Sequence, residues 1–339
     1  MRTRGRLLPL ALACAAWWLA SSTPIHAEIE VRLSVKFIRD WDGNWPGPAP
    51  TSTTDISTNT TFEVEIGRAN HVLHATGRGY RLTVAEYVPI RPTIPVGQSN
   101  QYWFNLNART NRATIEAAAL EDPLTWKWNT RAINVYVNNT SSGECSLLAN
   151  GGNAIALGAS IKRGTVLHEV GHFFNLLHTH DGDPDCGTAM PPFALADGDG
   201  LAATVPDHPC ITTQSDLVAA LPPELRAAVD TSWRNVMSYH DEEELLEDQM
   251  DIWGSVANVA RLYACNGRTR FVASDGWDDQ EGLLSFAPLA TLRRALSLIG
   301  TSHDVILLRS GTYQTDAFGM VTTPCTIGAS RGPATIVRP

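Results

Sequence analysis

Two histidines and a glutamate stand close together near the middle of the chain, in the stretch His168-Glu169-Val170-Gly171-His172. Residues four positions apart lie on nearly the same face of a helix, so the imidazoles of His168 and His172 can bind one metal ion together. Imidazole nitrogen is a common ligand of Zn²⁺, and Glu169 beside the first histidine can reach a metal-bound water as a general base. The spacing therefore predicts a zinc site with hydrolytic chemistry.

A third histidine, His178, follows six residues after His172. If one helix continued to His178, this residue would lie about 15 Å along the axis from His168, too far to share a metal ion. The chain must therefore turn sharply after His172. Asn175 stands where the turn is needed, and after Gly, Asn is the residue most tolerant of left-handed backbone angles. The alternative is an ordinary amphipathic helix whose histidines cap it or form hydrogen bonds.

Strands and helices alternate through the stretch that must position these residues. Alternating apolar residues predict strands at Glu28–Ile38, Tyr80–Ile90, Ala132–Val137 and Ala154–Ala159. Helical spacing predicts helices over Thr60–Leu73, Thr114–Trp128 with a break at Pro123, 163–178, Leu217–Val229 and Glu242–Tyr263. Asp181–Pro209 is rich in Gly, Pro and Asp and is predicted to be a long loop. This order predicts an α+β fold.

From about Asn266 the predicted elements become shorter, with one short helix followed by short apolar strands. A short helix is predicted at Ala290–Ile299, followed by short strands at Val305–Leu308, Cys325–Ile327 and Thr335–Val337. Asp304–Tyr313 resembles the opening of right-handed parallel β-helix domains. One coil of such a solenoid cannot bury its own face, and roughly three are needed. We therefore predict a domain over residues 28–265 and a β-helix-like segment over 266–339 that is either truncated or a small irregular appendage.

The histidine stretch and a second motif resemble one protein family. His-Glu-x-x-His-x-x-Asn-x-x-His resembles the zinc signature of metzincins, in which the residue at position 175 is usually Gly. Asn235-Val236-Met237-Ser238-Tyr239 resembles the methionine-containing turn of that family. The combination is most similar to the pappalysin (cytophagalysin-like) branch and covers about residues 30–265. The resemblance implies a catalytic domain divided by a cleft, with a sheet and two helices above it and His178 and the Met turn below it.

The resemblance also implies a role for each site residue. His168, His172 and His178 would be the zinc ligands, and Glu169 the base and proton shuttle. Met237 would form a hydrophobic floor under the metal, with a plain core methionine as the alternative. Tyr239 would approach the metal or stabilise an oxyanion, with a structural role as the alternative.

A second metal is suggested by the acidic run Asp197-Gly198-Asp199-Gly200. These carboxylates could bind Ca²⁺, although the ligand set of an EF-hand is absent. The alternative is a solvated acidic loop.

Composition and the N-terminus indicate an exported globular protein. The chain has 339 residues and a net charge of −9, with no basic run after the first few residues, which argues against a nucleic-acid partner. Residues 1–27 resemble a signal peptide, with arginines followed by the apolar stretch Leu7–Ala20. That stretch is too short to span a bilayer comfortably, and no other run reaches transmembrane length.

Five cysteines remain if Cys14 leaves with the signal peptide. In an exported protein they are disulfide candidates, and Cys186 with Cys210 is the predicted pair because both lie in one loop-rich stretch. The odd number leaves at least one cysteine free or paired outside this chain.

These observations predict a secreted zinc endopeptidase that hydrolyses peptide bonds in a protein or peptide substrate. The alternative is an exported binding or adhesion protein with a structural or vestigial zinc site. In that case the C-terminal segment would carry the function by contacting polysaccharide.

Overall fold

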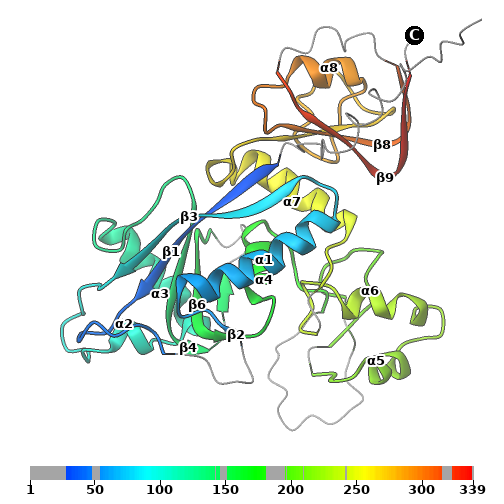
Figure 1. The fold of residues 1–339 in the computed structure, drawn as a ribbon. Coiled ribbons are helices and arrows are strands. Elements are labelled where there is room, and N and C mark those ends of the chain that lie inside the picture. Colours follow the sequence, from blue (N-terminus) through cyan, green and yellow to red (C-terminus); the bar gives the residue numbers. More distant parts are fainter. Residues whose placement is uncertain are drawn as a thin grey trace, which may run out of the picture.

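The structure is a computed structural model that describes residues 28–47, 54–141, 143–145, 151–180, 195, 197–208, 210–240, 243–314 and 323–337. The predicted signal peptide, residues 1–27, lies outside these ranges. The chain folds into a mixed sheet with helices on both faces, followed by a smaller sheet, so the predicted α+β class is confirmed (Figure 1). Within the described residues, no helix is both long and apolar enough to cross a membrane.

Six strands form the main sheet. They are β1 (Ile29–Ile38), β2 (Thr54–Asp55), β3 (Tyr80–Ile90), β4 (Ile133–Ser141), β5 (Gly143–Cys145) and β6 (Ala154–Ile161). Their order is β2-β6-β4-β1-β3, and β5 also pairs with β6. The pairs of β1 with β3, β1 with β4, and β4 with β6 are parallel. The short strands β2 and β5 run antiparallel to β6.

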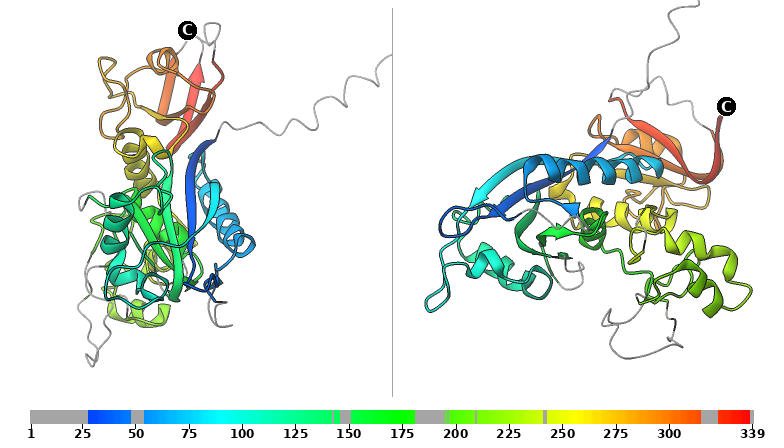
Figure 2. Two further views of the ribbon diagram at one scale, coloured as in Figure 1. Left: turned by 90° about the vertical axis from the view of Figure 1, so that its left-hand side faces the viewer. Right: turned by 60° about the horizontal axis from the view of Figure 1, so that its bottom comes forward.

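Helices cover both faces of this sheet, as the two sides of Figure 2 (left) show. On one face, α1 (Asn59–Ala75), α4 (Thr165–Phe173) and α7 (Glu247–Val259) share one hydrophobic core with alternate residues of β1 such as Leu33 and Val35. On the other face, α2 (Tyr102–Asn105) and α3 (Ala108–Glu121) enclose a second core. The alternating apolar residues predicted for β1 therefore lie on one side of the strand, where they form part of the main core.

The predicted helices differ from the observed ones mainly at their ends. The predicted helix over 163–178 ends at Phe173, and the one over Glu242–Tyr263 is α7, which is shorter. The stretch predicted as one helix over Leu217–Val229 is interrupted, because Pro222 and Pro223 lack the N–H group that a continuing helix needs. It consists of α5 (Gln214–Ala220), a 3₁₀ turn η2 (Arg226–Ala228) and α6 (Val229–Trp233), which share a small core of their own.

The C-terminal sheet consists of β7 (Thr269–Val272), β8 (Val305–Gln314) and β9 (Thr326–Val337), all parallel. The strands predicted separately at Cys325–Ile327 and Thr335–Val337 are joined in β9, which begins one residue later than predicted, at Thr326. Phe271, Val305 and Leu307 belong to the main core. On the other face, the helix α8 (Leu292–Ser297) packs against Ile306 and Leu308. The core of the main sheet thus buries the face of the C-terminal sheet that carries Phe271, Val305 and Leu307, a face that a single solenoid coil cannot bury by itself.

The first strand is also joined directly to the start of the C-terminal segment, after the short 3₁₀ helix η3 (Leu262–Ala264). The backbone N–H of Glu30 donates to Oδ1 of Asn266 at 2.8 Å. The amide of Asn266 in turn donates to Oε2 of Glu30 at 3.1 Å, and Val31 forms a β-bridge with Cys265.

Candidate metal centre

Helix α4 follows β6 directly, and every one of its residues is buried. Gly164 caps its start with a φ of 88°, a left-handed conformation that Gly adopts without strain. The N–H of Gly164 donates to Oε2 of the buried Glu65 on α1 at 2.9 Å. Val166 and Val170 face the core, which fixes the rotation of the helix and turns His168 and His172 away from the sheet.

The end of α4 has the hydrogen bonds of a Schellman motif. Asn175 has a φ of 68°, which confirms the left-handed turn predicted there. Its N–H donates to the carbonyl of His172 at 2.8 Å, and the N–H of Leu176 donates to the carbonyl of Gly171 at 2.9 Å. This reversal brings His178 back beside the helix that it has just left.

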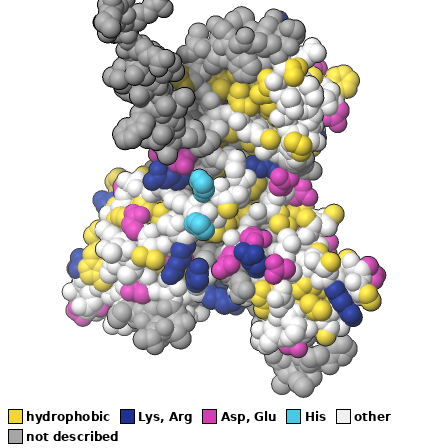
Figure 3. Space-filling view, turned by 45° about the vertical axis from the view of Figure 1, so that its right-hand side comes forward, with side chains coloured by type: hydrophobic (Ala, Val, Ile, Leu, Met, Phe, Trp, Pro, Cys, Tyr) yellow, Lys and Arg dark blue, Asp and Glu magenta, His cyan; other side chains and the backbone are white. Residues whose placement is uncertain are grey.

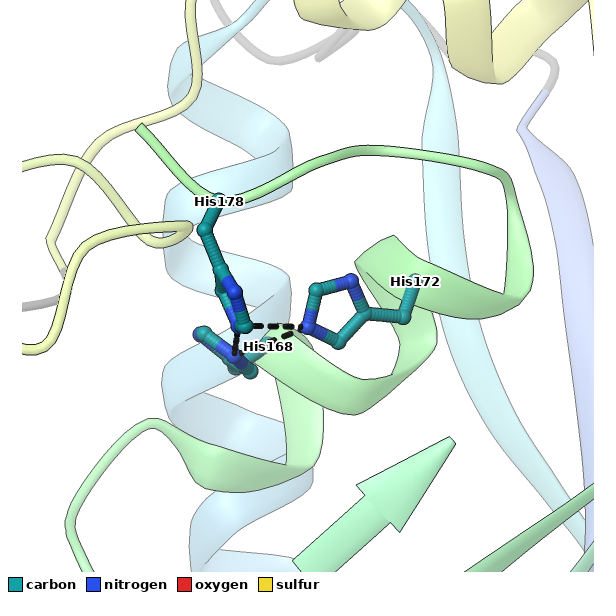
Figure 4. A group of neighbouring side chains, drawn as sticks. All are labelled: His168, His172 and His178. Carbon is teal, nitrogen blue, oxygen red and sulfur yellow. Dashed lines mark hydrogen bonds between the residues drawn. The ribbon is translucent and has the colours of Figure 1, made fainter. Parts of the chain in front are cut away.

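The three imidazoles point toward one another, His168 and His172 from α4 and His178 from the chain after the turn (Figure 4). Their Nε2 atoms lie 3.1 Å apart for His168 and His172, 3.2 Å for His168 and His178, and 2.9 Å for His172 and His178. Three nitrogens about 2.0–2.1 Å from one tetrahedral ion would be separated by roughly 3.3 Å. The observed triangle is therefore close to the size that one metal ion requires.

Hydrogen bonds to carbonyl groups select the metal-binding tautomer of two of these rings. Nδ1 of His168 lies 2.7 Å from the carbonyl oxygen of Val236, and Nδ1 of His172 lies 2.8 Å from that of Leu176. A carbonyl only accepts, so Nδ1 carries the proton and Nε2 keeps a lone pair directed at the common centre. Two facing lone pairs cannot form a hydrogen bond with each other, whereas a cation between them satisfies both.

Burial keeps the rings in their neutral form. Desolvation is the main cause that lowers the pKa of all three histidines, and it brings the pKa of His172 to about 4. Neutral imidazole is the form that binds metals. The cluster His168, His172 and His178 can therefore hold a metal ion.

The segment that resembles the Met turn lies directly under the helix. Met237 is fully buried, and a Cβ on Gly171 would come within 2.6 Å of its sulfur, so a larger residue at position 171 would displace the methionine side chain. The N–H of Met237 donates to Oδ1 of Asn235 at 2.8 Å. The side-chain amides of Asn235 and Gln249 exchange two hydrogen bonds of 3.0 Å, which tie the turn to α7.

The two other residues with predicted catalytic roles lie near the cluster. Glu169 is buried on α4, and a Cβ on Gly143 of β5 would lie 3.2 Å from its Oε1. The ring centre of Tyr239 lies 5.7 Å from that of His168 and 5.0 Å from that of His178. The structure thus brings the three histidines and Tyr239 together, and it places Glu169 on the same buried helix as His168 and His172.

Sequence reasoning missed two residues that shape the position of His178. The ring of His180 stacks on that of His178 with centres 4.8 Å apart and planes 11° apart. Gly198 packs so closely on the backbone carbonyls of His178 and His180 that a Cβ would overlap them. The His-x-His spacing was a visible signal for His180, whereas nothing local to Gly198 indicates its contact.

The acidic run 197–200 has a different arrangement. Oδ1 of Asp197 accepts from the N–H of Gly200 at 2.8 Å, and Oδ1 of Asp199 accepts from Leu201 at 3.0 Å and from Thr204 at 2.7 Å. Of the residues that the structure describes, only the three histidines form a group suited to a metal ion. The described geometry therefore gives the predicted calcium site no support.

The cysteines are partly described. Cys210 is disulfide-bonded, and Cys265 and Cys325 are free. Cys186 lies outside the described residues, so its pairing with Cys210 stays a prediction.

Comparisons with known proteins add little to this geometry. No protein-family model matches the chain, and no curated protein matches it. Among solved structures, the chain is similar to one titled "Structure of a chaperone-substrate complex", with a TM-score of 0.29 and 13% sequence identity. That match covers 48% of this chain and 26% of the other, and a likeness of this size carries no argument about fold or function.

Proposed function

We propose that this protein is a zinc-dependent endopeptidase of the metzincin type, within or near the pappalysin branch. The observation that carries the proposal is the convergence of His168, His172 and His178, whose Nε2 atoms lie 2.9–3.2 Å apart. The reversal at Asn175 and the contact of Met237 with Gly171 support the same assignment. The predicted signal peptide adds the expectation that the protein is secreted.

The chemistry divides between a metal ion and the side chains of this chain. A Zn²⁺ ion held by the three histidines would lower the pKa of a coordinated water and polarise a peptide carbonyl. Glu169 follows His168 on the buried helix, and its carboxylate takes the proton of the attacking water and delivers it to the leaving amine. The carbonyls of Val236 and Leu176 hold His168 and His172 in one tautomer throughout.

Tyr239 and the surroundings of the cluster complete this proposal. The phenol of Tyr239 lies beside two of the rings, where its hydroxyl can donate to an oxyanion that develops on the scissile carbonyl. Burial of α4 excludes water from the helix side, which strengthens the electrostatic interactions of Glu169 with the reacting atoms.

Substitution of Glu169 tests the proposal. The chain from Glu28 onward is loaded with zinc and incubated with an unfolded protein substrate, beside Glu169→Ala and the control Glu121→Ala. Glu121 is exposed at the end of α3. Loss of a general base should lower turnover by roughly 10²–10⁴-fold while one zinc stays bound. Equal cleavage by the parent and Glu169→Ala would show that Glu169 is not the base.

One observation favours a second candidate function, an exported binding protein. Trp277 and Phe286 of the C-terminal segment are 70% and 78% exposed, and exposed aromatic rings suit stacking on sugars. The parallel order of β7, β8 and β9 supports the β-helix-like interpretation of this segment. If the parent chain is retained on insoluble cellulose and Trp277→Ala is not, the result would support polysaccharide binding through this segment. Equal retention of the parent chain and Trp277→Ala would argue against this function.

A further inference from the structure

A pocket of about 460 Å³ lies against the N-terminal end of α4, outside the histidine cluster. Its walls are α1, the start of α4, and the residues just before and after the Met turn, Arg234 and Glu243. The volume is within the range of small-molecule sites in proteins.

The inner surface of this pocket is largely apolar. Val64 and Val72 of α1 and Leu167 of α4 line it, and the side chain of Val64 stays 51% exposed. Gly67 leaves the middle of the α1 wall bare, because a Cβ placed there would meet no atom within 4 Å. The pocket therefore offers apolar surface that no side chain of the described chain fills.

The charged residues of the lining leave a net positive charge, with three arginines against two glutamates. Glu65 is fully engaged, since it accepts from Gly164 at 2.9 Å and pairs with Arg68. Arg163 is the least committed cation: it approaches Glu243 only to 4.0 Å, and 65% of its side chain is exposed. Figure 3 shows a face of the molecule on which Lys and Arg side chains gather beside Asp and Glu.

We propose that this pocket binds an anionic ligand with an apolar body. The hydrocarbon part lies over Gly67 between Val64, Val72 and Leu167, and a carboxylate meets the guanidinium of Arg163. Guanidinium groups bind carboxylates through two parallel hydrogen bonds, which suits this end of the pocket. A medium-chain fatty acid and the C-terminus of an apolar peptide share this chemistry.

Calorimetric titration of the full, zinc-loaded chain tests the proposal with two carboxylate probes. These are decanoate below its micelle concentration and acetyl-Leu-Val-Leu with a free C-terminus. Their neutral counterparts are decanol and the tripeptide amide. At least one carboxylate should bind, and its counterpart should bind tenfold or more weakly, because a charge-assisted hydrogen bond is lost. The probe that binds identifies the source of the ligand.

Two pairs of variants locate the binding. Gly67→Leu fills the bare wall and should abolish binding, whereas Ala75→Leu, exposed on the same helix, should not. Arg163→Glu should weaken binding at least tenfold, whereas Arg131→Glu makes the same charge change on an exposed residue outside the lining. A carboxylate held at the histidine cluster instead would bind Gly67→Leu and the parent alike. That result, or no binding of either carboxylate, overturns the proposal.

Discussion

A single backbone conformation at Asn175 decides whether three histidines can meet. Asn175→Gly should keep zinc binding and stability nearly unchanged, because Gly adopts the left-handed angle without strain. Asn175→Val should lose about 1–2 kcal/mol of stability and bind zinc more weakly, because a β-branched residue resists this angle. Urea denaturation and zinc competition with a chelator measure the two effects. Equal zinc affinity in both variants would show that the backbone conformation at position 175 does not affect zinc binding.

The room for the carboxylate of Glu169 depends on another single residue, Gly143. A Cβ at this position would lie 2.6 Å from Leu157 and 3.2 Å from Oε1 of Glu169. Gly143→Ala should therefore reduce kcat more than zinc content, since it displaces the base and not a ligand. Steady-state kinetics and elemental analysis check this, with Gly67→Ala as the control in open space. Zinc loss in parallel with activity would mean that the substitution disrupts the whole site.

At the scale of elements, the sequence predicts what depends on local pattern. The alternation in β1 and the helical spacing in α1 predict the bounds of these elements to within a few residues. The turn at Asn175 is predicted because His178 must return to the other two histidines. Contacts between distant segments are not visible in such patterns. The approach of Gly143 to Glu169, the stacking of His180 on His178 and the packing of the C-terminal sheet on the main core depend on how elements far apart in the sequence meet.

The link between the Met turn and α7 is one such contact, and it gives a prediction for Gln249. The amides of Asn235 and Gln249 are buried and exchange two hydrogen bonds, and Oε1 of Gln249 also accepts from Leu246 at 3.0 Å. Gln249→Ala should cost about 2–4 kcal/mol by leaving buried groups unpaired. It should also weaken zinc binding, because Val236 in this turn holds His168.

Gln249→Glu serves as the conservative comparison for this link. A carboxylate accepts both hydrogen bonds that reach Oε1 but cannot donate to Asn235 as the amide does. Thermal unfolding and chelator competition should place this variant between the parent and Gln249→Ala. If Gln249→Ala lowered stability and left zinc affinity unchanged, the link would serve the fold alone.

At the scale of the whole molecule, stability should depend on pH through one buried amine. Lys36 is fully buried, and its amine donates to the hydroxyl of Ser34 at 2.6 Å and to Asn134. Burial lowers its pKa from 10.5 to about 7, against the opposing charge of Glu86. Between these values the unfolded chain binds more protons than the folded one. The free energy of unfolding should therefore rise with pH across this window, by at most about 1.4 kcal/mol per pH unit.

Urea denaturation at pH 7, 8 and 9 measures this dependence against Lys36→Met. The methionine removes the titrating group and keeps an apolar chain of similar length, so its stability should change much less over the same range. Parallel curves for the two proteins would show that the amine of Lys36 does not titrate in this window.

The two hydrogen bonds between Glu30 and Asn266 join positions 236 residues apart in the chain. Proteins rich in such distant contacts fold slowly, because long loops must close before the contacts form. During synthesis β1 emerges early, and its partners β3, β4 and the residues around Asn266 follow in turn. β1, which is apolar at alternate positions, thus completes its pairing only after residues 265 and 266 have been made. It is the segment through which a half-made chain would first aggregate.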